Sequence, residues 1–97
     1  MIPLSDSQIT EALLNLPSWT RDEDAVKAVW TFSDFTEAFR FLTGVAFIAE
    51  KYQHHPEIRN VYHRVELRLS THDAGDKITQ KDIELATAIS ELKASQV

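Results

Sequence analysis

The sequence predicts an α+β fold in which one four-stranded antiparallel sheet has three helices packed on one face. Two kinds of observation support this expectation. Three segments combine a helix-start motif with apolar residues at helical spacing. In residues 26–32 and 64–71, apolar and other residues alternate with a period of two, and each segment has a neighbour with which it could pair through a short turn. The expected order of elements is α-β-β-α-β-β-α.

Length and composition limit the class of protein. The chain has 97 residues, which predicts a single domain over residues 1–97. It is 43% hydrophobic and 26% charged, as is usual for a globular protein. Ten Lys and Arg against fifteen Asp and Glu give a net charge of −5, which argues against direct nucleic-acid binding.

The sequence also predicts where in the cell the protein is found. No apolar run approaches the roughly 20 residues that cross a bilayer, so we expect no membrane span. Asp6 and Glu11 stand where a secretory signal would be basic and apolar. The absence of cysteine excludes disulfides and thiolate chemistry within this chain. The expected location is therefore cytoplasmic.

The first helix is expected between Ser5 and Leu16. The run Ser5-Asp6-Ser7-Gln8 fits a capping box, in which Ser5 is the N-cap and Gln8 reaches back to it. Apolar residues then follow at helical spacing, at positions 9, 12, 13 and 16. Pro17 is expected to stop the helix.

The first hairpin is expected to follow this helix. In residues 26–32 the apolar Val26, Ala28, Trp30 and Phe32 alternate with Lys27, Val29 and Thr31, which is the pattern of a half-buried antiparallel strand. Residues 19–22 are expected to pair with residues 25–32 through the acidic turn of residues 22–24.

The second helix is expected to begin at Asp34 and Glu37. One apolar stripe contains Phe35, Ala38, Phe39, Leu42, Val45, Ala46 and Ala49. Phe41, Phe47 and Ile48 fall outside it, so residues 41–49 are apolar nearly all round and should be buried on more than one side. In so small a chain a second subunit is the favoured cover, and the alternative is a central helix in a monomer.

The second hairpin and the third helix complete the pattern. Residues 57–60 are expected to pair with residues 64–71 through a turn near residues 61–63, with Val65, Leu67, Leu69 and Thr71 on one face. The third helix opens with the Thr-x-x-Asp motif of Thr79 to Asp82. Its inward stripe is Asp82, Leu85, Ala86, Ile89 and Leu92, so Asp82 heads an apolar face.

All four histidines lie between residues 54 and 72. His54 and His55 precede Pro56 and so mark a helix end. His72 closes the strand of residues 64–71, and pairing of the last two strands would bring it back toward His54 and His55. His63 has no partner in this scheme and is expected at the surface. Because imidazole both gives and takes protons near neutral pH, this grouping favours proton transfer.

Two carboxylates could lie close to these histidines. Asp82 begins the third helix, and Glu50 precedes His54 by one helical turn on the same face. Each residue also has a structural explanation: the His pair could cap a helix C-terminus, His72 could be a turn residue, Asp82 could bind free N–H groups, and Glu50 could be solvated. Convergence of all of them would favour a site. Adjacent histidines point apart and no His-x-His or HExxH spacing is present, so we expect no metal.

These residues form a pattern that resembles the pterin-4a-carbinolamine dehydratase family, also known as the dimerisation cofactor of a homeodomain transcription factor. The pattern is His54-His55-Pro56, five residues, Tyr62, nine residues, and His72. Further similar stretches are residues 49–57, 60–65, 69–75 and 82–86, together with Trp19 and residues 31–46 upstream. The resemblance runs from about residue 5 to residue 93.

The resemblance implies the same element order, a homodimer or homotetramer, and no cofactor. The implied reaction is loss of water from 4a-hydroxytetrahydropterin to give quinonoid dihydropterin, which recycles the pterin of an aromatic amino acid hydroxylase. It implies His54, His55 and His72 as the catalytic set, with His54 and His72 favoured for proton transfer and His55 for holding the substrate.

By the same resemblance, Glu50, Pro56, Thr71, Asp73 and Asp82 are the expected substrate-binding residues. Asp82 would orient or charge-stabilise an imidazole, Glu50 would accept hydrogen bonds from the pterin, and the backbone of residues 71–73 would bind the ring edge.

Some positions depart from the family pattern. Ile58 stands where many relatives have Trp, and Gln53 replaces an acidic residue. Asp76-Lys77 replaces a glycine-rich turn, and the gap between His72 and Asp82 is one residue longer. The alternative function is a non-enzymatic oligomeric adaptor or assembly factor on the same fold, which would use the helical surface rather than the histidines.

Overall fold

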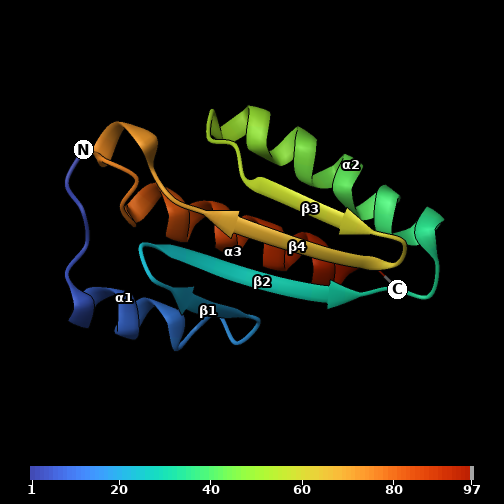
Figure 1. Ribbon diagram of the computed structural model, residues 1–97, viewed down its shortest axis with the longest axis horizontal. Helices are drawn as coiled ribbons and strands as arrows, with labels where there is room; N and C mark the ends of the chain where they lie inside the picture. Colours follow the sequence, from blue (N-terminus) through green and yellow to red (C-terminus); the bar gives the residue numbers. More distant parts are fainter. Residues whose placement is uncertain (97) are drawn as a thin grey trace.

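The computed structural model describes residues 1–96, and its elements follow the predicted order (Figure 1). The helices are α1 (Asp6–Leu13), α2 (Phe35–Tyr52) and α3 (Gln80–Ser95). The strands are β1 (Trp19–Asp22), β2 (Ala25–Thr31), β3 (Glu57–Val61) and β4 (Arg64–Leu69), and a short 3₁₀ turn, η1 (His72–Ala74), follows β4. In the described part of the chain, no helix combines the length and apolar character needed to cross a membrane.

The four strands form one antiparallel sheet in the order β1-β2-β4-β3. The fold class and the two predicted hairpins are therefore confirmed. The hairpins meet through β2 and β4, where Val26 pairs with Leu69 and Trp30 with Val65. Strand β3 is left at one edge, beside α2, while β1 forms the other edge, beside α1 (Figure 1).

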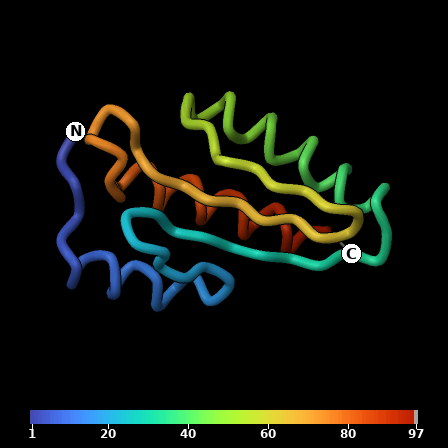
Figure 2. The backbone as a smooth tube through the Cα atoms, in the orientation of Figure 1, coloured from blue at the N-terminus to red at the C-terminus, as the bar shows by residue number. Residues whose placement is uncertain are grey.

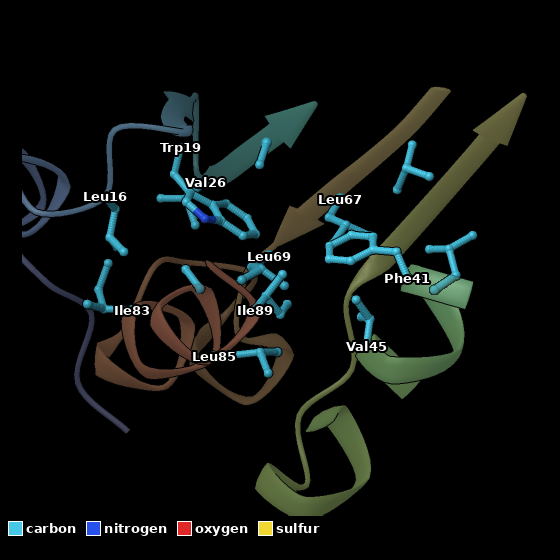
Figure 3. Packing of buried hydrophobic residues seen from close by; sticks show 14 of the residues in the cluster. Leu16, Trp19, Val26, Phe41, Val45, Leu67, Leu69, Ile83, Leu85 and Ile89 are labelled. Carbon is cyan, nitrogen blue, oxygen red and sulfur yellow. The ribbon is translucent and has the colours of Figure 1, made fainter. Parts of the chain in front are cut away.

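The core lies between the inner face of the sheet and the helices. Because cross-strand partners share a face, the alternating apolar residues of β2 and β4 form one buried surface. Leu85 and Ile89 of α3 are buried in the same cluster, and Figure 3 shows Phe41 and Val45 of α2 beside Leu67. Trp19 closes the cluster at the β1 side, where its indole N–H donates to Ser90 Oγ at 2.8 Å.

Helix α1 ends earlier than predicted. Its capping box at Ser5 and Gln8 is formed, but the helix stops at Leu13 rather than Leu16. Backbone N–H groups of residues 14–16 bond to carbonyls three residues earlier, which tightens the chain ahead of Pro17. Leu16 still reaches the core from this turn.

The buried face of α2 differs from the predicted stripe. Phe41, which was expected outside the stripe, is fully buried, whereas Phe35, Phe39 and Ala46 are exposed. The reason is that α2 lies along the β3 edge of the sheet (Figure 1) and also contacts α3, so the side of the helix that carries Phe41 faces the core. Gly44 permits this approach, because a Cβ there would lie 2.8 Å from Leu92 Cδ2.

The segment after β4 is held from two sides. Figure 2 shows the N-terminal segment running beside the loop that leads into α3. The Leu4 N–H donates to the Ile78 carbonyl at 2.8 Å, and Lys77 Nζ bonds to Asp24 Oδ2 at 2.9 Å. This ion pair lowers the pKa of Asp24, chiefly through the hydrogen bond from Lys77. The contacts fix where η1 stands relative to the start of α3.

The packing of α2 leads to a stability prediction. Phe41→Ala should lower the free energy of unfolding by about 3–5 kcal/mol, because it removes a fully buried ring and leaves a cavity. Leu14→Ala, at a side chain that is 78% exposed, should change it by no more than about 0.5 kcal/mol. Urea unfolding of both variants measures the difference, and equal effects would contradict this placement of α2.

Candidate active site

The end of α2 directs two adjacent histidines to different surroundings. The helix stops at Tyr52, and Gln53 takes a left-handed conformation with φ of 51°. Pro56 disfavours a helical backbone at His55, the residue before it. His54 consequently turns into the protein and is buried, whereas His55 remains exposed.

Asp82 is the centre of a buried hydrogen-bond network. Its side chain is 0% exposed and accepts from His54 Nε2 at 2.5 Å through Oδ1. Its second oxygen, Oδ2, accepts from the Thr71 hydroxyl at 2.9 Å and from the Thr79 N–H at 2.8 Å. Because the Thr71 proton is directed at Asp82, the Thr79 hydroxyl must donate to Thr71 Oγ1, 2.7 Å away. Every oxygen in the network therefore has a defined role.

This network sets the orientation of the His54 ring. Since Asp82 accepts from Nε2, that nitrogen carries a hydrogen, and in the neutral ring Nδ1 is left with a free lone pair. A buried carboxylate behind an imidazole fixes both its tautomer and its position. The arrangement leaves Nδ1 able to accept a proton.

Glu50 contacts a different histidine from the one expected. The helical spacing placed it beside His54, but its Oε2 lies 2.5 Å from His55 Nε2. The expectation was wrong because α2 ends before His54, and Gln53 turns the chain so that only His55 passes Glu50. Both side chains of this pair are largely solvent-exposed.

His72 is exposed on η1, directly after β4. Its Nδ1 lies 3.1 Å from Asp76 Oδ1, and its side chain is 92% exposed. The hydrogen bond to Asp76 raises the pKa of His72 above its ordinary value, with smaller contributions from the charges of Asp76 and Asp73. Gly75 and Asp76 both have positive φ, at 76° and 60°, which turns the chain back so that Asp76 faces His72.

A hollow of about 270 Å³ lies where these segments meet. All three candidate catalytic histidines line it, together with Thr71 and Asp73 from the predicted set. Glu50, Pro56 and Asp82 do not line it, and Glu50 and Asp82 each stand behind a histidine instead. The lining also includes Gln53, Ser70 and Lys81, which the sequence reasoning did not propose. Lys81 could have been found from its position one residue before Asp82 on the first turn of α3.

His63 lies elsewhere, in the turn between β3 and β4. It was expected at the surface, but it is half-buried, and its ring stacks on Tyr62 with centroids 4.3 Å apart. Its Nδ1 is buried without a hydrogen-bond partner. Within residues 1–96, no group of three or more His, Asp or Glu side chains is arranged to hold a metal ion.

Comparison with known proteins identifies the family. The model of the Pterin 4 alpha carbinolamine dehydratase family matches residues 2–92. A Bradyrhizobium protein named "Putative pterin-4-alpha-carbinolamine dehydratase" is 50% identical over 94 residues, which cover 95% of this chain and 94% of that protein.

Two solved structures share the fold. A transcriptional coactivator/pterin dehydratase from Brucella melitensis is 35% identical with a TM-score of 0.88, covering 94% of this chain and 98% of its own. A pterin dehydratase-like RuBisCO assembly factor of the alpha-carboxysome is 18% identical with a TM-score of 0.67, covering 81% of this chain and 93% of its own, and that likeness concerns the fold alone. The chain belongs to the pterin-4-alpha-carbinolamine dehydratase family.

Proposed function

We propose that this protein removes water from 4a-hydroxytetrahydropterin to give quinonoid dihydropterin, by histidine acid–base catalysis. The observation that carries the proposal is the meeting of His54, His55 and His72 at one hollow, with a buried carboxylate behind His54. Family membership supports the substrate class. The product would return to a tetrahydropterin pool used by an aromatic amino acid hydroxylase.

The reaction requires one proton donor and one proton acceptor. The C4a–O bond breaks, the leaving hydroxide takes a proton to become water, and a ring nitrogen loses a proton as the C=N bond forms. No electron is gained or lost, so no redox cofactor is needed. Two imidazoles can supply both proton transfers at neutral pH, and each typically contributes about 10²–10⁴-fold.

We assign the acceptor role to His54. Its Nδ1 is the ring nitrogen that Asp82 leaves free. When His54 takes up a proton, Asp82 becomes the counter-ion of the imidazolium in a setting shielded from water, which stabilises the charge that forms. Asp82 thus acts as a positioning residue, because it is completely buried and does not line the hollow.

We assign the donor role to His72. Its raised pKa keeps more of the ring protonated near neutral pH, and its exposure lets it exchange protons with water after each turnover. His55, oriented by Glu50, would hold the substrate. Thr71 and Asp73 would contact the ring edge, and Pro56 would shape the adjoining backbone.

Removal of both proton-transfer residues tests the reaction. The double variant His54→Ala with His72→Ala should lose at least about 100-fold in turnover of chemically generated 4a-hydroxytetrahydropterin, measured by stopped-flow absorbance. His63→Gln is the matched control, because this histidine lies outside the hollow. Circular dichroism verifies that both variants fold. A folded double variant with unchanged turnover would contradict the proposal.

The role of His72 leads to a pH prediction. Asp76→Asn removes the acceptor that raises the pKa of His72, so that pKa should fall toward its ordinary value. If His72 is the donor, the alkaline limb of kcat/KM then moves to lower pH. Asn also tolerates the left-handed backbone at this position.

An NMR titration of His72 measures the pKa directly, and Asp6→Asn on α1 is the control for lost charge. A lowered His72 pKa with an unmoved pH profile would remove His72 from the donor role.

We further propose that a second copy of this chain covers the outer face of α2. Phe39 and Phe47 on this face are 52% and 75% exposed, and Ile58 of β3 lies nearby across an apolar groove of about 560 Å³. A small domain rarely leaves so much apolar surface open. The edge strand β3 offers a second contact. If the β3 strands of two copies pair antiparallel with Ile58 at the centre, Glu57 of one copy lies opposite the partner's Arg59.

The size of the particle in solution tests this contact. Phe39→Glu should shift the protein from an oligomer to a monomer in light scattering, because it buries a charge in the groove. Val29→Glu, on the opposite face of the sheet, should leave the oligomer intact. A monomeric wild-type protein would contradict the proposal.

A further inference from the structure

The loop that carries His72 is closed by its own backbone. The Thr71 N–H donates to the Lys77 carbonyl at 2.8 Å, and the Asp76 N–H donates to the Thr71 carbonyl at 3.0 Å. Thr71 is itself buried, whereas none of residues 72–77 is. Packing therefore holds the base of this loop but not the part that bears His72.

One ion pair joins this loop to another part of the fold. Lys77 Nζ donates to Asp24 Oδ2 at 2.9 Å, and within the described residues this is the one side-chain hydrogen bond that connects residues 72–77 to the rest of the chain. Asp24 is a firm anchor, because β1 and β2 pair on both sides of the two-residue turn that contains it. The ion pair therefore ties Lys77 to the end of the first hairpin.

We propose that Lys77 is a positioning residue for the proton donor, His72. Its ion pair with Asp24 fixes the backbone of the preceding residue, Asp76, and thereby the carboxylate that bonds the donor ring. The inference rests on the proposed function, in which His72 is the donor. Neither Lys77 nor Asp24 lines the hollow, so both act from outside it.

The backbone of Asp76 explains why such support is needed. Its φ of 60° is a left-handed conformation, which a residue with a side chain adopts at some cost in energy. The Asp76 N–H and the Lys77 carbonyl both bond to Thr71, but these bonds leave the side chains free. The ion pair of Lys77 is the contact that holds the exposed end of this strained turn in place.

The charged groups around His72 limit how Lys77 can influence it. The hydrogen bond and charge of Asp76 raise the pKa of His72, and so does the charge of Asp73. The other titratable side chains at the hollow come from the end of α2 and the first turn of α3: His54, His55 and Lys81. A substitution of Lys77 leaves all of these groups in place. It can therefore change the pKa of His72 only through its own lost charge or through the position of Asp76.

These two routes predict shifts of opposite sign in the variant Lys77→Met. Loss of a nearby positive charge alone would raise the pKa of His72, because less repulsion opposes its protonation. Release of Asp76 from the ring would lower that pKa, because the acceptor that favours the charged ring is lost. We expect an NMR titration to show a lowered pKa of His72 in Lys77→Met. A raised or unchanged pKa would overturn the inference.

Further variants assign the effect to the ion pair. Lys77→Arg keeps both the charge and the donor, so the pKa of His72 should stay at its wild-type value. Asp24→Asn should add nothing in the Lys77→Met background, because residues that act through one contact are not additive. Both partners are about half exposed, so these variants should fold, as circular dichroism verifies.

Lys27→Met is the matched control. This lysine belongs to the same hairpin and forms an ion pair with Asp22, so its loss removes one cation without touching the loop. The pKa of His72 should not fall in this variant. A fall equal to that in Lys77→Met, or additive effects of Lys77→Met and Asp24→Asn, would show that general charge rather than the ion pair is responsible.

Turnover separates this inference from the proposed reaction. An exposed ion pair changes an equilibrium by up to about fivefold, so Lys77→Met should lower kcat for 4a-hydroxytetrahydropterin by about 2- to 5-fold on the alkaline side of the pH profile, with KM nearly unchanged. The NMR titration needs no substrate and reads the position of Asp76 in any case. A wild-type protein without turnover would overturn the proposed reaction and leave the loop contact. An active wild-type protein whose His72 pKa does not fall in Lys77→Met would overturn this inference alone.

Discussion

The structure depends on one buried carboxylate. Asp82 is completely enclosed, and a charge in that position is tolerated only when hydrogen bonds replace its lost water. Three donors do so: His54 from the end of α2, Thr71 from the end of the β4 segment, and the Thr79 N–H at the start of α3. The same side chain therefore caps a helix, ties three separate segments together and orients an imidazole. The Asp82 carboxylate therefore contributes both to the stability of the fold and to the proposed chemistry, so a substitution of Asp82 should affect both.

The three histidines around that buried carboxylate differ in how far they are exposed to solvent. His54 is buried and held by Asp82, whereas His55 is exposed and held by Glu50. His72 is the most exposed of the three, and its partner Asp76 comes from the same short turn. This gradient suits a reaction with one preset acceptor and one donor that must exchange protons with solvent.

Local chemistry in the sequence predicted much of this, and non-local packing set the rest. The capping residues Ser5 and Thr79 and the alternating strands were found because each signal lies within a few residues. The buried face of α2 was misjudged because two apolar stripes overlap on it, and only the sideways position of α2 decides that Phe41 faces the core. The partner of Glu50 was misjudged because one left-handed residue, Gln53, ends the helix earlier. The place of Ser70 at the hollow follows from tertiary contacts that no spacing rule contains, whereas Lys81 could have been found from its position beside Asp82.

The central claim is that Asp82 fixes the His54 tautomer and leaves Nδ1 as the proton acceptor. A long-range proton–nitrogen NMR spectrum of the histidine rings, recorded at a pH where His54 is neutral, reads this directly. The account predicts a protonated Nε2 and an unprotonated Nδ1 for His54, with Asp82 accepting the Nε2 hydrogen. A hydrogen on Nδ1 in the neutral ring would contradict it, because the nitrogen that faces Asp82 would then carry no hydrogen for the carboxylate to accept.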